Sequence, residues 1–411
     1  MSFEREVEKA ERDRGFDLAG RLTKLDNDGL FRECSPADRV AEQATFAPPS
    51  GGDLPVLDGK EALVFASNNY LGLANHPRVR EAASAACEVV GTGSGASRLV
   101  TGDTLVHRDL EQLLAEVKGT ERALCFSSGY AANVGTITAL APDVIFSDEH
   151  NHASIIDGCR LSGAEVVVYD HRNTNALEKA MSGRDRKRES EESWLVVTDS
   201  VFSMDGTVGP LEAICEVAES YGAWVMVDEA HATGLYEAGG GIVQREGLGD
   251  RVHVQMGTLS KALASQGGYV AGSESLVSLL VNTARSFVFS TGLSPPAAAA
   301  ASEALHVARY GDRRAQLWEN VTRLRASLEK LDYDVRGESQ ILPVIVGDRN
   351  DALALAEALR ERGIVAPAIR PPTVPEGTSR LRVTPMATHS SADIDRCLDA
   401  FKAASREVGL R

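Results

Sequence analysis

The 411-residue chain is predicted to have an α/β fold, with a large domain built on a mainly parallel sheet and a smaller α+β domain at the C-terminal end. Two observations predict it. Between residues 63 and 272, short apolar runs alternate with amphipathic helical patterns, which is typical of a parallel sheet covered by helices on both faces. After residue 295 the order changes to long helices followed by short strands, which indicates a second domain. We therefore divide the chain into an N-terminal arm (1–48), a large domain (49–295) and a small domain (296–411).

The elements of the large domain follow from this alternation. The first ~48 residues are predicted to be a helical arm that ends in a loop with Pro48 and Pro49. Strands are expected at Ala123–Phe126, Val144–Phe146, Val166–Tyr169, Leu195–Thr198, Trp224–Val227 and Val252–Met256. Helices are expected between them, among others at Leu105–Val117, Leu177–Met181 and Leu211–Tyr221. The charged stretch Gly183–Ser193 is interpreted as a solvated surface loop.

The small domain begins with a proline-initiated helix. Pro295 and Pro296 open an alanine-rich helix, because proline is tolerated in the first turn, and a further helical pattern continues to about Leu331. The remainder predicts strands at Ile341–Val346 and Leu381–Thr384, and helices at Ala352–Arg362 and Ile394–Ala404. This mixture of elements gives the α+β class of the segment.

Composition excludes several classes of protein. The net charge of −16 disfavours nucleic acid and anionic membranes as partners, because both would be repelled. The apolar runs are too short to cross a bilayer, and the charged N-terminus lacks the layout of a signal peptide, so we expect a cytoplasmic protein. None of the six cysteines forms a C-x-x-C pair, so neither a metal site nor a disulfide framework is expected.

Two charged residues at predicted strand ends carry the strongest chemical signal. Asp228 ends the apolar run Trp224–Val227, and Lys261 follows the run Val252–Met256. In open α/β sheets, ligands bind at the carboxyl ends of the strands. A desolvated lysine can attack an aldehyde cofactor, and an aspartate can keep a pyridine nitrogen protonated. Alone, each residue has an ordinary structural interpretation; together they predict a pyridoxal 5'-phosphate (PLP) site.

Further polar residues stand at the same predicted edge. Ser127-Ser128-Gly129-Tyr130 opens a helical pattern after a strand, and backbone N–H groups at such a start bind phosphate. Thr258 and Ser260 add hydroxyl groups, Ser203 follows another strand, and His152 could stack on an aromatic ring. Two arginines near a C-terminal strand, Arg370 and Arg382, suit a carboxylate, although composition alone favours ordinary surface positions for them.

These motifs in this order resemble the α-oxoamine synthase family of fold-type-I (aspartate-aminotransferase-like) PLP enzymes. The resemblance runs from about Phe31 to the C-terminus. The motifs that carry it are SNNYLGL (67–73), GTGSGASRLVTG (91–102), HRDLE (107–111), SSGYAAN (127–133), NHASIIDG (151–158), VFSMDGTVGPL (201–211), VDEAHATG (227–234), GTLSKALAS (257–265) and FSTGLSPP (289–296). It implies a seven-stranded sheet in a PLP-binding large domain and a homodimer with shared active sites.

The resemblance also implies roles for individual residues. Lys261 would be the Schiff-base lysine and the acid/base, Asp228 would pair with the pyridine nitrogen, His231 and Ser203 would face the phenolic oxygen, and His152 would stack on the ring. Ser128, Gly129, Tyr130 and Thr258 would hold the phosphate, and Ser290 and Thr291 would reach the phosphate of the neighbouring subunit. Asn68 and Arg382 would hold the amino-acid carboxylate, with Arg370 and Arg32 as further basic residues near the substrate.

The C-terminal motif AIRPPTVPEGTSRLRVT (368–384) is most similar to the biotin-pathway members, which implies condensation of L-alanine with pimeloyl-CoA. Glycine with acetyl-CoA, or another acyl-CoA, remains the alternative. An aminotransferase or lyase disagrees with the SNNYLGL, NHAS and RLR motifs, and a non-catalytic relative would lack the lysine. Reading Gly91–Gly102 as a dinucleotide fingerprint fails, because a helix-like segment and not a strand precedes it.

Overall fold

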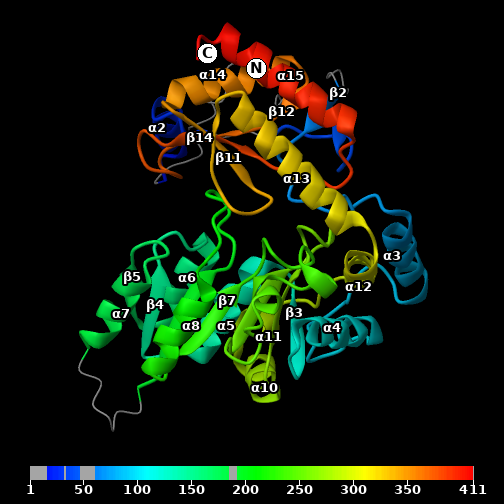
Figure 1. Ribbon diagram of the computed structural model, residues 1–411. Coiled ribbons are helices and arrows are strands. Elements are labelled where there is room, and N and C mark those ends of the chain that lie inside the picture. Colours follow the sequence, from blue (N-terminus) through cyan, green and yellow to red (C-terminus); the bar gives the residue numbers. More distant parts are fainter. Residues whose placement is uncertain (1–15, 32–33, 47–60, 185–191, 411) are drawn as a thin grey trace.

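The computed structural model describes residues 16–31, 34–46, 61–184 and 192–410. Figure 1 shows two lobes: a larger one around a central sheet and a smaller one that contains the C-terminus, joined near α12 and α13. Within the described segments, no helix has both the length and the apolar character that a membrane span would need.

The larger lobe contains a seven-stranded sheet in the order β3-β9-β8-β7-β6-β4-β5. Its strands are β3 (Arg122–Phe126), β4 (Val144–Asp148), β5 (Glu165–Tyr169), β6 (Trp194–Asp199), β7 (Trp224–Asp228), β8 (Val254–Thr258) and β9 (Gly268–Gly272). All neighbours pair in parallel except β9, which is antiparallel to both β3 and β8. The prediction of a mainly parallel seven-stranded sheet is therefore confirmed, although the apolar runs of the sequence did not predict β9.

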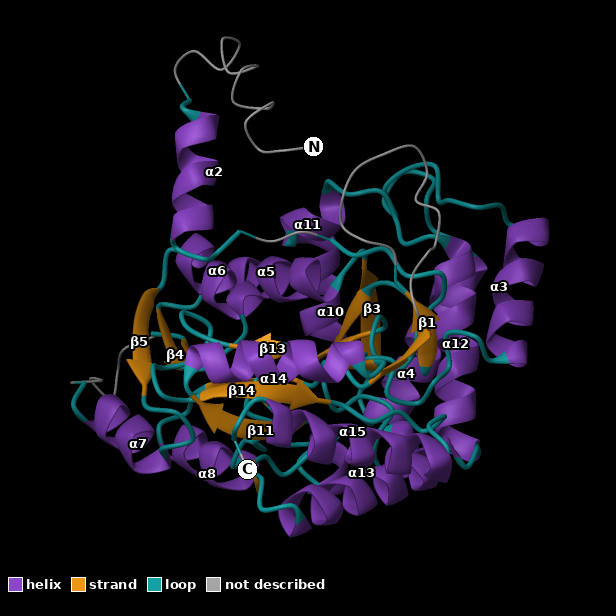
Figure 2. Cartoon of the chain, turned by 90° about the horizontal axis from the view of Figure 1, so that it is seen from above, coloured by secondary structure: helices purple, strands orange, loops and turns teal. Residues whose placement is uncertain are grey.

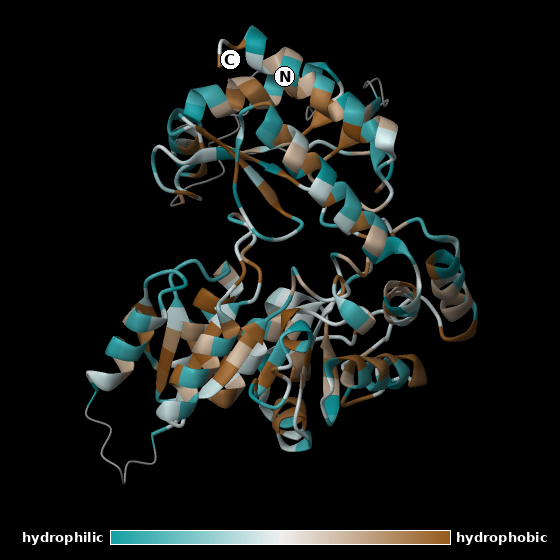
Figure 3. Ribbon diagram, in the orientation of Figure 1, coloured by the Kyte–Doolittle hydropathy of each residue, from teal (hydrophilic) through white to brown (hydrophobic). Residues whose placement is uncertain are grey.

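Both faces of this sheet are buried, because alternate residues of each strand enter two separate cores. Leu124 and Phe126 of β3 pack with helices on one face, whereas Ala123 and Cys125 pack with helices on the other. The first face is covered by α5 (Gly129–Leu140), α6 (Ala153–Ser162), α10 (Glu274–Thr283) and α11 (Arg285–Val288). The second is covered by α4 (Leu105–Lys118), α7 (Thr174–Ser182), α8 (Leu211–Ser220) and α12 (Pro295–Tyr310). In Figure 3 the strands are accordingly brown, and the outward faces of the helices are mostly teal.

Two further helices complete the larger lobe. Helix α3 (Pro77–Val89) packs against α12, and α9 (Ile242–Arg245) follows the loop after β7. The expected proline-initiated helix is confirmed, since Pro295 occupies the first turn of α12.

The smaller lobe contains two sheets. One is a four-stranded antiparallel sheet in the order β10-β11-β14-β13, and the other is a three-stranded sheet in the order β1-β2-β12. Its strands are β1 (Gln43–Thr45), β2 (Glu61–Val64), β10 (Asp334–Val335), β11 (Leu342–Gly347), β12 (Ile364–Val365), β13 (Ala368–Ile369) and β14 (Ser379–Val383). Helices α13 (Arg313–Lys330), α14 (Arg349–Glu361) and α15 (Ser391–Glu407) cover these sheets. Strand β2 lies within the range 49–295 that was expected to form the large domain, but it pairs with β1 and β12 in a sheet of the smaller lobe.

The N-terminal arm contains α2 (Leu18–Asn27), which projects from the rest of the chain in Figure 2. No residue of α2 is buried, and its apolar side chains Leu18, Leu22 and Leu25 are between 40% and 44% exposed. Their spacing places them on one face of the helix, which is uncovered in the single chain.

Candidate active site

A cavity of about 200 Å³ lies at the carboxyl ends of β6, β7 and β8, beside the N-terminus of α5. It is lined by Ser128, Gly129, Tyr130, His152, Asp199, Ser203, Asp228, Ala230, His231, Thr258, Ser260 and Lys261. A site at the carboxyl ends of the strands was predicted from the sequence. Nine of the predicted cofactor-binding residues line this cavity. Asp199 and Ala230 were not predicted, and Ser260 had been considered only as an additional hydroxyl.

Asp228 is the last residue of β7 and is 3% exposed. Its Oδ2 accepts a hydrogen bond from Asn133 Nδ2 at 2.7 Å, and its Oδ1 accepts one from the backbone N–H of Ala230 at 2.8 Å. These two bonds fix the plane of the carboxylate. A buried carboxylate held in this way suits a cationic ring nitrogen, because it is oriented before the ligand arrives.

Asp199 ends β6 and is the register partner of Asp228 on the neighbouring strand. It is 5% exposed, and its Oδ2 accepts a hydrogen bond from the backbone N–H of His152 at 2.9 Å. Burial, reinforced by the neighbouring Asp228, raises the pKa of Asp199 well above its ordinary value. Sequence reasoning missed this residue although the rule that selected Asp228 also applies to it, since Asp199 directly follows the predicted strand Leu195–Thr198.

Lys261 lies just beyond β8, in the same cavity as the two aspartates. Burial lowers the pKa of Lys261, whereas the carboxyl groups of Asp228 and Asp199 oppose the shift. A lysine with a lowered pKa has a larger neutral fraction, and the neutral amine is the nucleophile that attacks an aldehyde.

Two histidines line the cavity. His152 caps the N-terminus of α6, where its Nδ1 accepts from the backbone N–H of Ser154 at 3.2 Å, and its ring is open to the solvent-facing side. His231 is 5% exposed, and its Nδ1 lies 2.7 Å from the hydroxyl of the fully buried Tyr70. Burial, with the nearby positive charge of Lys261, lowers the pKa of His231 well below its ordinary value, which keeps its ring neutral.

The end of the cavity near α5 has the features of a phosphate site. Ser128 is the N-cap of α5, and its hydroxyl accepts from the backbone N–H of Ala131 at 3.0 Å. Ser128, Gly129 and Tyr130 line the cavity, so the uncapped N–H groups of this helix start lie at its wall. An added Cβ at Gly129 would lie 3.4 Å from Thr258, so glycine permits close approach here. The side chain of Tyr130 turns away, because its hydroxyl donates to Asp157 of α6; only its backbone N–H remains for a phosphate.

The smaller lobe reaches the cavity through β14. Arg382 donates from Nε to the carbonyl of Ser203 at 2.6 Å and from Nη2 to Asn68 Oδ1 at 3.1 Å. Tyr70 donates to the same Asn68 oxygen at 3.0 Å, so Arg382, Asn68 and His231 belong to one network. The structure therefore connects the predicted carboxylate residues Asn68 and Arg382 to Ser203 and His231 of the cavity wall.

Arg380, two residues before Arg382 on β14, forms an ion pair with Asp205 of the loop that follows Ser203. Residues i and i+2 of a strand face the same side, so both arginines contact this loop. Asp205 is also 3.4 Å from His150 Nδ1. Although burial opposes ionisation, the hydrogen bonds from His150 and Arg380 lower the pKa of Asp205 to about 2.

A second cavity, of about 280 Å³, adjoins the first. His152 and Ser203 belong to the walls of both cavities, and the other wall is formed by residues 373–375 of the smaller lobe. The two cavities thus lie directly beside each other at these shared residues.

The remaining predicted site residues lie elsewhere. Arg370 donates a hydrogen bond to the carbonyl of Gly29 in the arm, and it does not line either of these two cavities. Ser290 and Thr291 lie between α11 and α12, outside the cavity of their own chain. Arg32 lies outside the described residues.

The residue after Asp228 faces away from the cavity. Glu229 is fully buried and forms an ion pair with the fully buried Lys118 at the end of α4. Its Oε1 also accepts from the backbone N–H of Val243 at 2.9 Å, and Lys118 donates to Gln244 Oε1 at 3.1 Å. This pair anchors the segment that carries Asp228 and His231 to the helix behind the sheet. Sequence reasoning did not detect it, because the two residues are far apart in the chain.

The donor set fits PLP. A buried, oriented carboxylate can hold a protonated ring nitrogen, a lysine with a lowered pKa can bind an aldehyde, and a helix N-terminus flanked by hydroxyl groups can hold a phosphate. Gly129 leaves the backbone of that helix start unobstructed. Among the residues with described positions, no cluster of side chains has the composition of a metal site.

Comparison with known proteins places the chain in a family. Residues 60–401 match the model of the family "Aminotransferase class I and II". A curated 8-amino-7-oxononanoate synthase from Geobacter sulfurreducens is 45% identical over 400 residues, which are 96% of this chain and 99% of the relative. A second one, from Anaeromyxobacter dehalogenans, is 48% identical over 391 residues, 94% of each chain.

A solved serine palmitoyltransferase from S. paucimobilis with a bound PLP–myriocin aldimine superposes with a TM-score of 0.86 at 30% identity, covering 96% of this chain and 98% of that chain. The expected family, fold class and cofactor are thereby confirmed. The chain belongs to the aminotransferase class I and II family and, within it, to the PLP-dependent α-oxoamine synthases that include the 8-amino-7-oxononanoate synthases.

Proposed function

We propose that the protein catalyses the decarboxylative condensation of L-alanine with pimeloyl-CoA, giving 8-amino-7-oxononanoate, CoA and CO2. The observation that carries the proposal is the meeting of Lys261 and Asp228 in one cavity, with the Arg382–Asn68 pair hydrogen-bonded to its wall at Ser203, in a chain that is 45% identical to a curated 8-amino-7-oxononanoate synthase over nearly its whole length. In the overall reaction, the Cα of alanine bonds to the thioester carbonyl carbon, the C–S bond breaks, and the carboxylate carbon leaves as CO2.

Bound PLP supplies the electron sink that stabilises negative charge at the α-carbon of the amino acid. Asp228 holds a proton at the pyridine nitrogen, since its carboxylate is fixed by Asn133 and Ala230. Lys261 would remove the α-proton of the bound amino acid and would return a proton after CO2 has left. Its lowered pKa makes the neutral amine available for the first of these steps.

The residues around the ring orient it. His152 would cover one face, and His231, whose Nδ1 lies 2.7 Å from the Tyr70 hydroxyl, would hydrogen-bond the phenolic oxygen of the cofactor. The N–H groups of Gly129 and Tyr130, with the hydroxyl groups of Ser128 and Thr258, hold the phosphate, and Ser203 faces the phenolic side. Arg382 already uses Nε and Nη2 for Ser203 and Asn68, so we assign its Nη1 to the amino-acid carboxylate.

We place the acyl chain in the second cavity, between the loop 202–205 and residues 373–375, because this space opens directly onto His152 and Ser203. Arg370 lies beyond it, bonded to the arm, and we propose that it and Arg32 approach the substrate from that side.

We further propose a homodimer with shared sites. Uncovered apolar side chains support it: Leu99 is 52% exposed, Val100 74% and Phe289 72%, and α2 exposes its leucine face. Exposed apolar side chains of this size are the kind of surface that a partner subunit covers. In this arrangement Ser290 and Thr291, which lie outside their own cavity, would contact the phosphate in the other subunit.

Release of free CoA from PLP-loaded protein tests the activity. We expect release with L-alanine and pimeloyl-CoA, and little with glycine and acetyl-CoA. Pairs with L-serine and palmitoyl-CoA complete the comparison, since the structural neighbour is a serine palmitoyltransferase. The Lys261→Ala variant is the control and must release none. Preference for glycine and acetyl-CoA would replace the proposed substrates, and the absence of release with every pair would refute the proposed activity.

A further inference from the structure

The motifs GTGSGASRLVTG and HRDLE have no role in the site described so far, yet the structure joins both to the segment that contains Ser290 and Thr291. The backbone N–H of Gly292 donates to the carbonyl of Ala96 at 3.0 Å. The hydroxyl of Ser294 donates to the carbonyl of Thr92 at 2.7 Å. The glycine-rich loop (91–102) and the segment 289–294 are therefore one layer.

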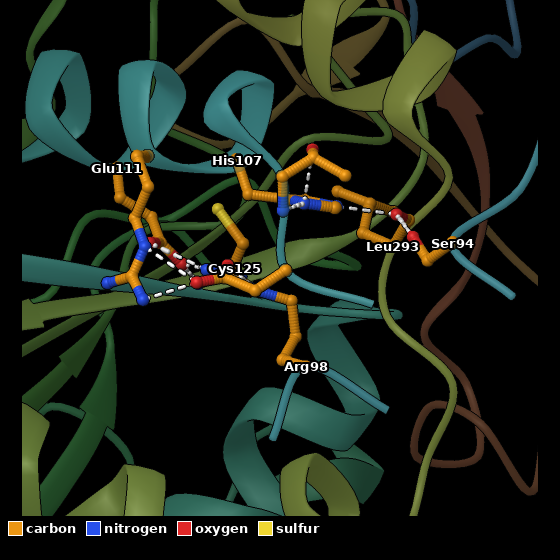
Figure 4. Close-up of polar contacts among 9 residues, drawn as sticks. Ser94, Arg98, His107, Glu111, Cys125 and Leu293 are labelled. Carbon is orange, nitrogen blue, oxygen red and sulfur yellow. Dashed lines mark hydrogen bonds and ion pairs between the residues drawn. The ribbon is translucent and has the colours of Figure 1, made fainter. Parts of the chain in front are cut away.

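The carbonyl of Leu293 is the centre of this layer. It accepts from the hydroxyl of Ser94 at 2.6 Å and from Nε2 of His107 at 2.6 Å, and Figure 4 shows both side chains directed at it from opposite sides. His107 lies in the first turn of α4 and is completely buried. Two donors on one buried carbonyl oxygen satisfy both of its lone pairs.

The tautomer of His107 follows from its neighbours. Nδ1 accepts from the backbone N–H of Thr104 at 3.2 Å, so Nε2 must carry the proton that is donated to Leu293. Burial lowers the pKa of His107 and favours this neutral form. The ring thus has a single protonation state that satisfies both contacts.

A second contact fixes the glycine-rich loop to the sheet. The buried Arg98 forms a bidentate pair with Glu111 at 2.8 and 3.0 Å, and Glu111 accepts from the backbone N–H of Cys125 in β3 at 2.9 Å. Figure 4 shows Arg98, Glu111 and Cys125 together beside His107. Strand β3 leads within three residues to Ser128, so the layer is anchored to the same strand that positions the phosphate end of the cavity.

We infer that His107 is a positioning residue for the cofactor site of the neighbouring subunit. By fixing the carbonyl of Leu293, it sets the conformation of Ser290 and Thr291, which are presented beside the exposed Leu99, Val100 and Phe289. The inference rests on the proposed homodimer. It states which site is affected: His107 of one chain affects PLP binding in the other chain and not in its own.

The first experiment compares PLP affinity in three variants, measured by cofactor absorbance during titration of the apoprotein. His107→Phe removes both ring nitrogens, Ser94→Ala removes the other donor to Leu293, and His389→Phe is the matched control. His389 is also buried and also accepts a backbone N–H through Nδ1, at 2.9 Å from Met386, but it lies in the smaller lobe. We expect His107→Phe to weaken PLP binding about ten-fold, Ser94→Ala less, and His389→Phe not at all.

The second experiment tests the direction with mixed dimers. His107→Phe and Lys261→Ala chains, carrying different tags, are co-expressed and the heterodimer is purified. The visible band of lysine-bound PLP then reports only the site with Lys261, whose Ser290 and Thr291 come from the partner with an intact His107. We expect this site to bind PLP with wild-type affinity, unlike either site of the His107→Phe homodimer. Should His107→Phe be insoluble, Ser94→Ala takes its place.

The outcomes separate the inference from the proposed function. A heterodimer that stays as weak as the His107→Phe homodimer would show that His107 acts within its own chain, which overturns the inference and leaves the dimer standing. Equal weakening by His389→Phe would assign the effect to general destabilisation and would overturn it also. A wild-type protein that sediments as a monomer with tightly bound PLP would refute the shared-site dimer itself.

Discussion

Asp199 and Asp228 are register partners on adjacent parallel strands, and both carboxyl groups line the cavity that contains Lys261. Two carboxylates so close in a buried site cannot both be charged without a cost, because their negative charges repel each other where little water screens them. Asp228 has two hydrogen-bond donors, from Asn133 and Ala230, whereas the pKa of Asp199 is raised by burial and by Asp228. We therefore assign the charge to Asp228 and the proton to Asp199.

This assignment predicts opposite results for two matched substitutions. Asp199→Asn imitates the neutral form, so CoA release should stay within about three-fold of wild type, whereas Asp228→Asn should lower it by roughly 100-fold or more, because the partner of the ring nitrogen is lost. Steady-state CoA release measures both. A larger loss for Asp199→Asn than for Asp228→Asn would reverse the assignment.

The same assignment also predicts how the stability of the fold changes with pH. A carboxyl whose pKa is raised in the folded state stabilises the fold below its unfolded pKa of about 3.9 and loses that contribution as the pH rises toward the folded pKa. Apo Asp199→Asn should therefore become more stable relative to wild type as the pH rises above about 4. Melting temperatures of the two proteins across pH 4 to 8 would show a difference that does not change with pH if Asp199 were ionised.

Asp205 should behave in the opposite way. Its pKa is lowered to about 2 in the folded protein, so its stabilising contribution is complete above the unfolded value of about 3.9 and is lost as the pH falls toward 2. Asp205→Asn should lose roughly 2 kcal/mol at pH 6 to 7, since each pKa unit corresponds to about 1.4 kcal/mol. The difference from wild type in denaturant unfolding should shrink below pH 4. An undiminished difference at low pH would show that packing, and not the charge, is responsible.

Arg382 is predicted to act on binding of the amino acid. Arg382→Lys keeps the charge but loses the planar fork, so we expect the KM for L-alanine to rise about ten-fold or more with a smaller change in kcat. The matched control is Arg380→Lys on the same strand, which alters the pair with Asp205. A larger rise in KM from Arg380→Lys would contradict the assigned role of Arg382.

The buried pair of Lys118 and Glu229 is predicted to matter for stability more than for chemistry. Lys118→Met leaves Glu229 charged and unpaired in the interior, which should cost roughly 3–5 kcal/mol. Adding Glu229→Gln to Lys118→Met should restore part of that loss, because it removes the unpaired charge. Thermal melts of the single and double variants measure the effect, and a double variant no more stable than Lys118→Met would contradict it.

The sequence predicted the parallel sheet because strands buried on both faces are continuous apolar runs, as in Val144–Phe146 and Leu195–Thr198. It did not predict β9, whose sequence GYVAG contains two glycines and only three apolar residues. Strand β12 has two residues and β1 has three, too few for any periodicity, so their pairing with β2 could not be inferred.

The candidate site was predictable where a residue type and a strand end coincide, as for Asp228 and Lys261. Contacts that depend on three-dimensional proximity were not predictable. The distance of 2.7 Å between Tyr70 and His231 joins residues from two different parts of the fold, and the ion pair of Lys118 with Glu229 joins α4 to the loop after β7. Tyr130 was placed at the phosphate by its motif, but its hydroxyl bonds to Asp157.

The pairing of β2 with β12 has a consequence for biosynthesis. The register places Leu63 beside Ile364, so this sheet joins residues roughly 300 positions apart, and the whole larger lobe is synthesised between its two strands. During translation, the seven-stranded sheet can assemble while β2 still has no partner from the C-terminal part. Arg382 and Asn68 can form their hydrogen bond only after the last part of the chain has emerged from the ribosome. The capacity to hold a substrate is therefore the final property that the nascent protein acquires.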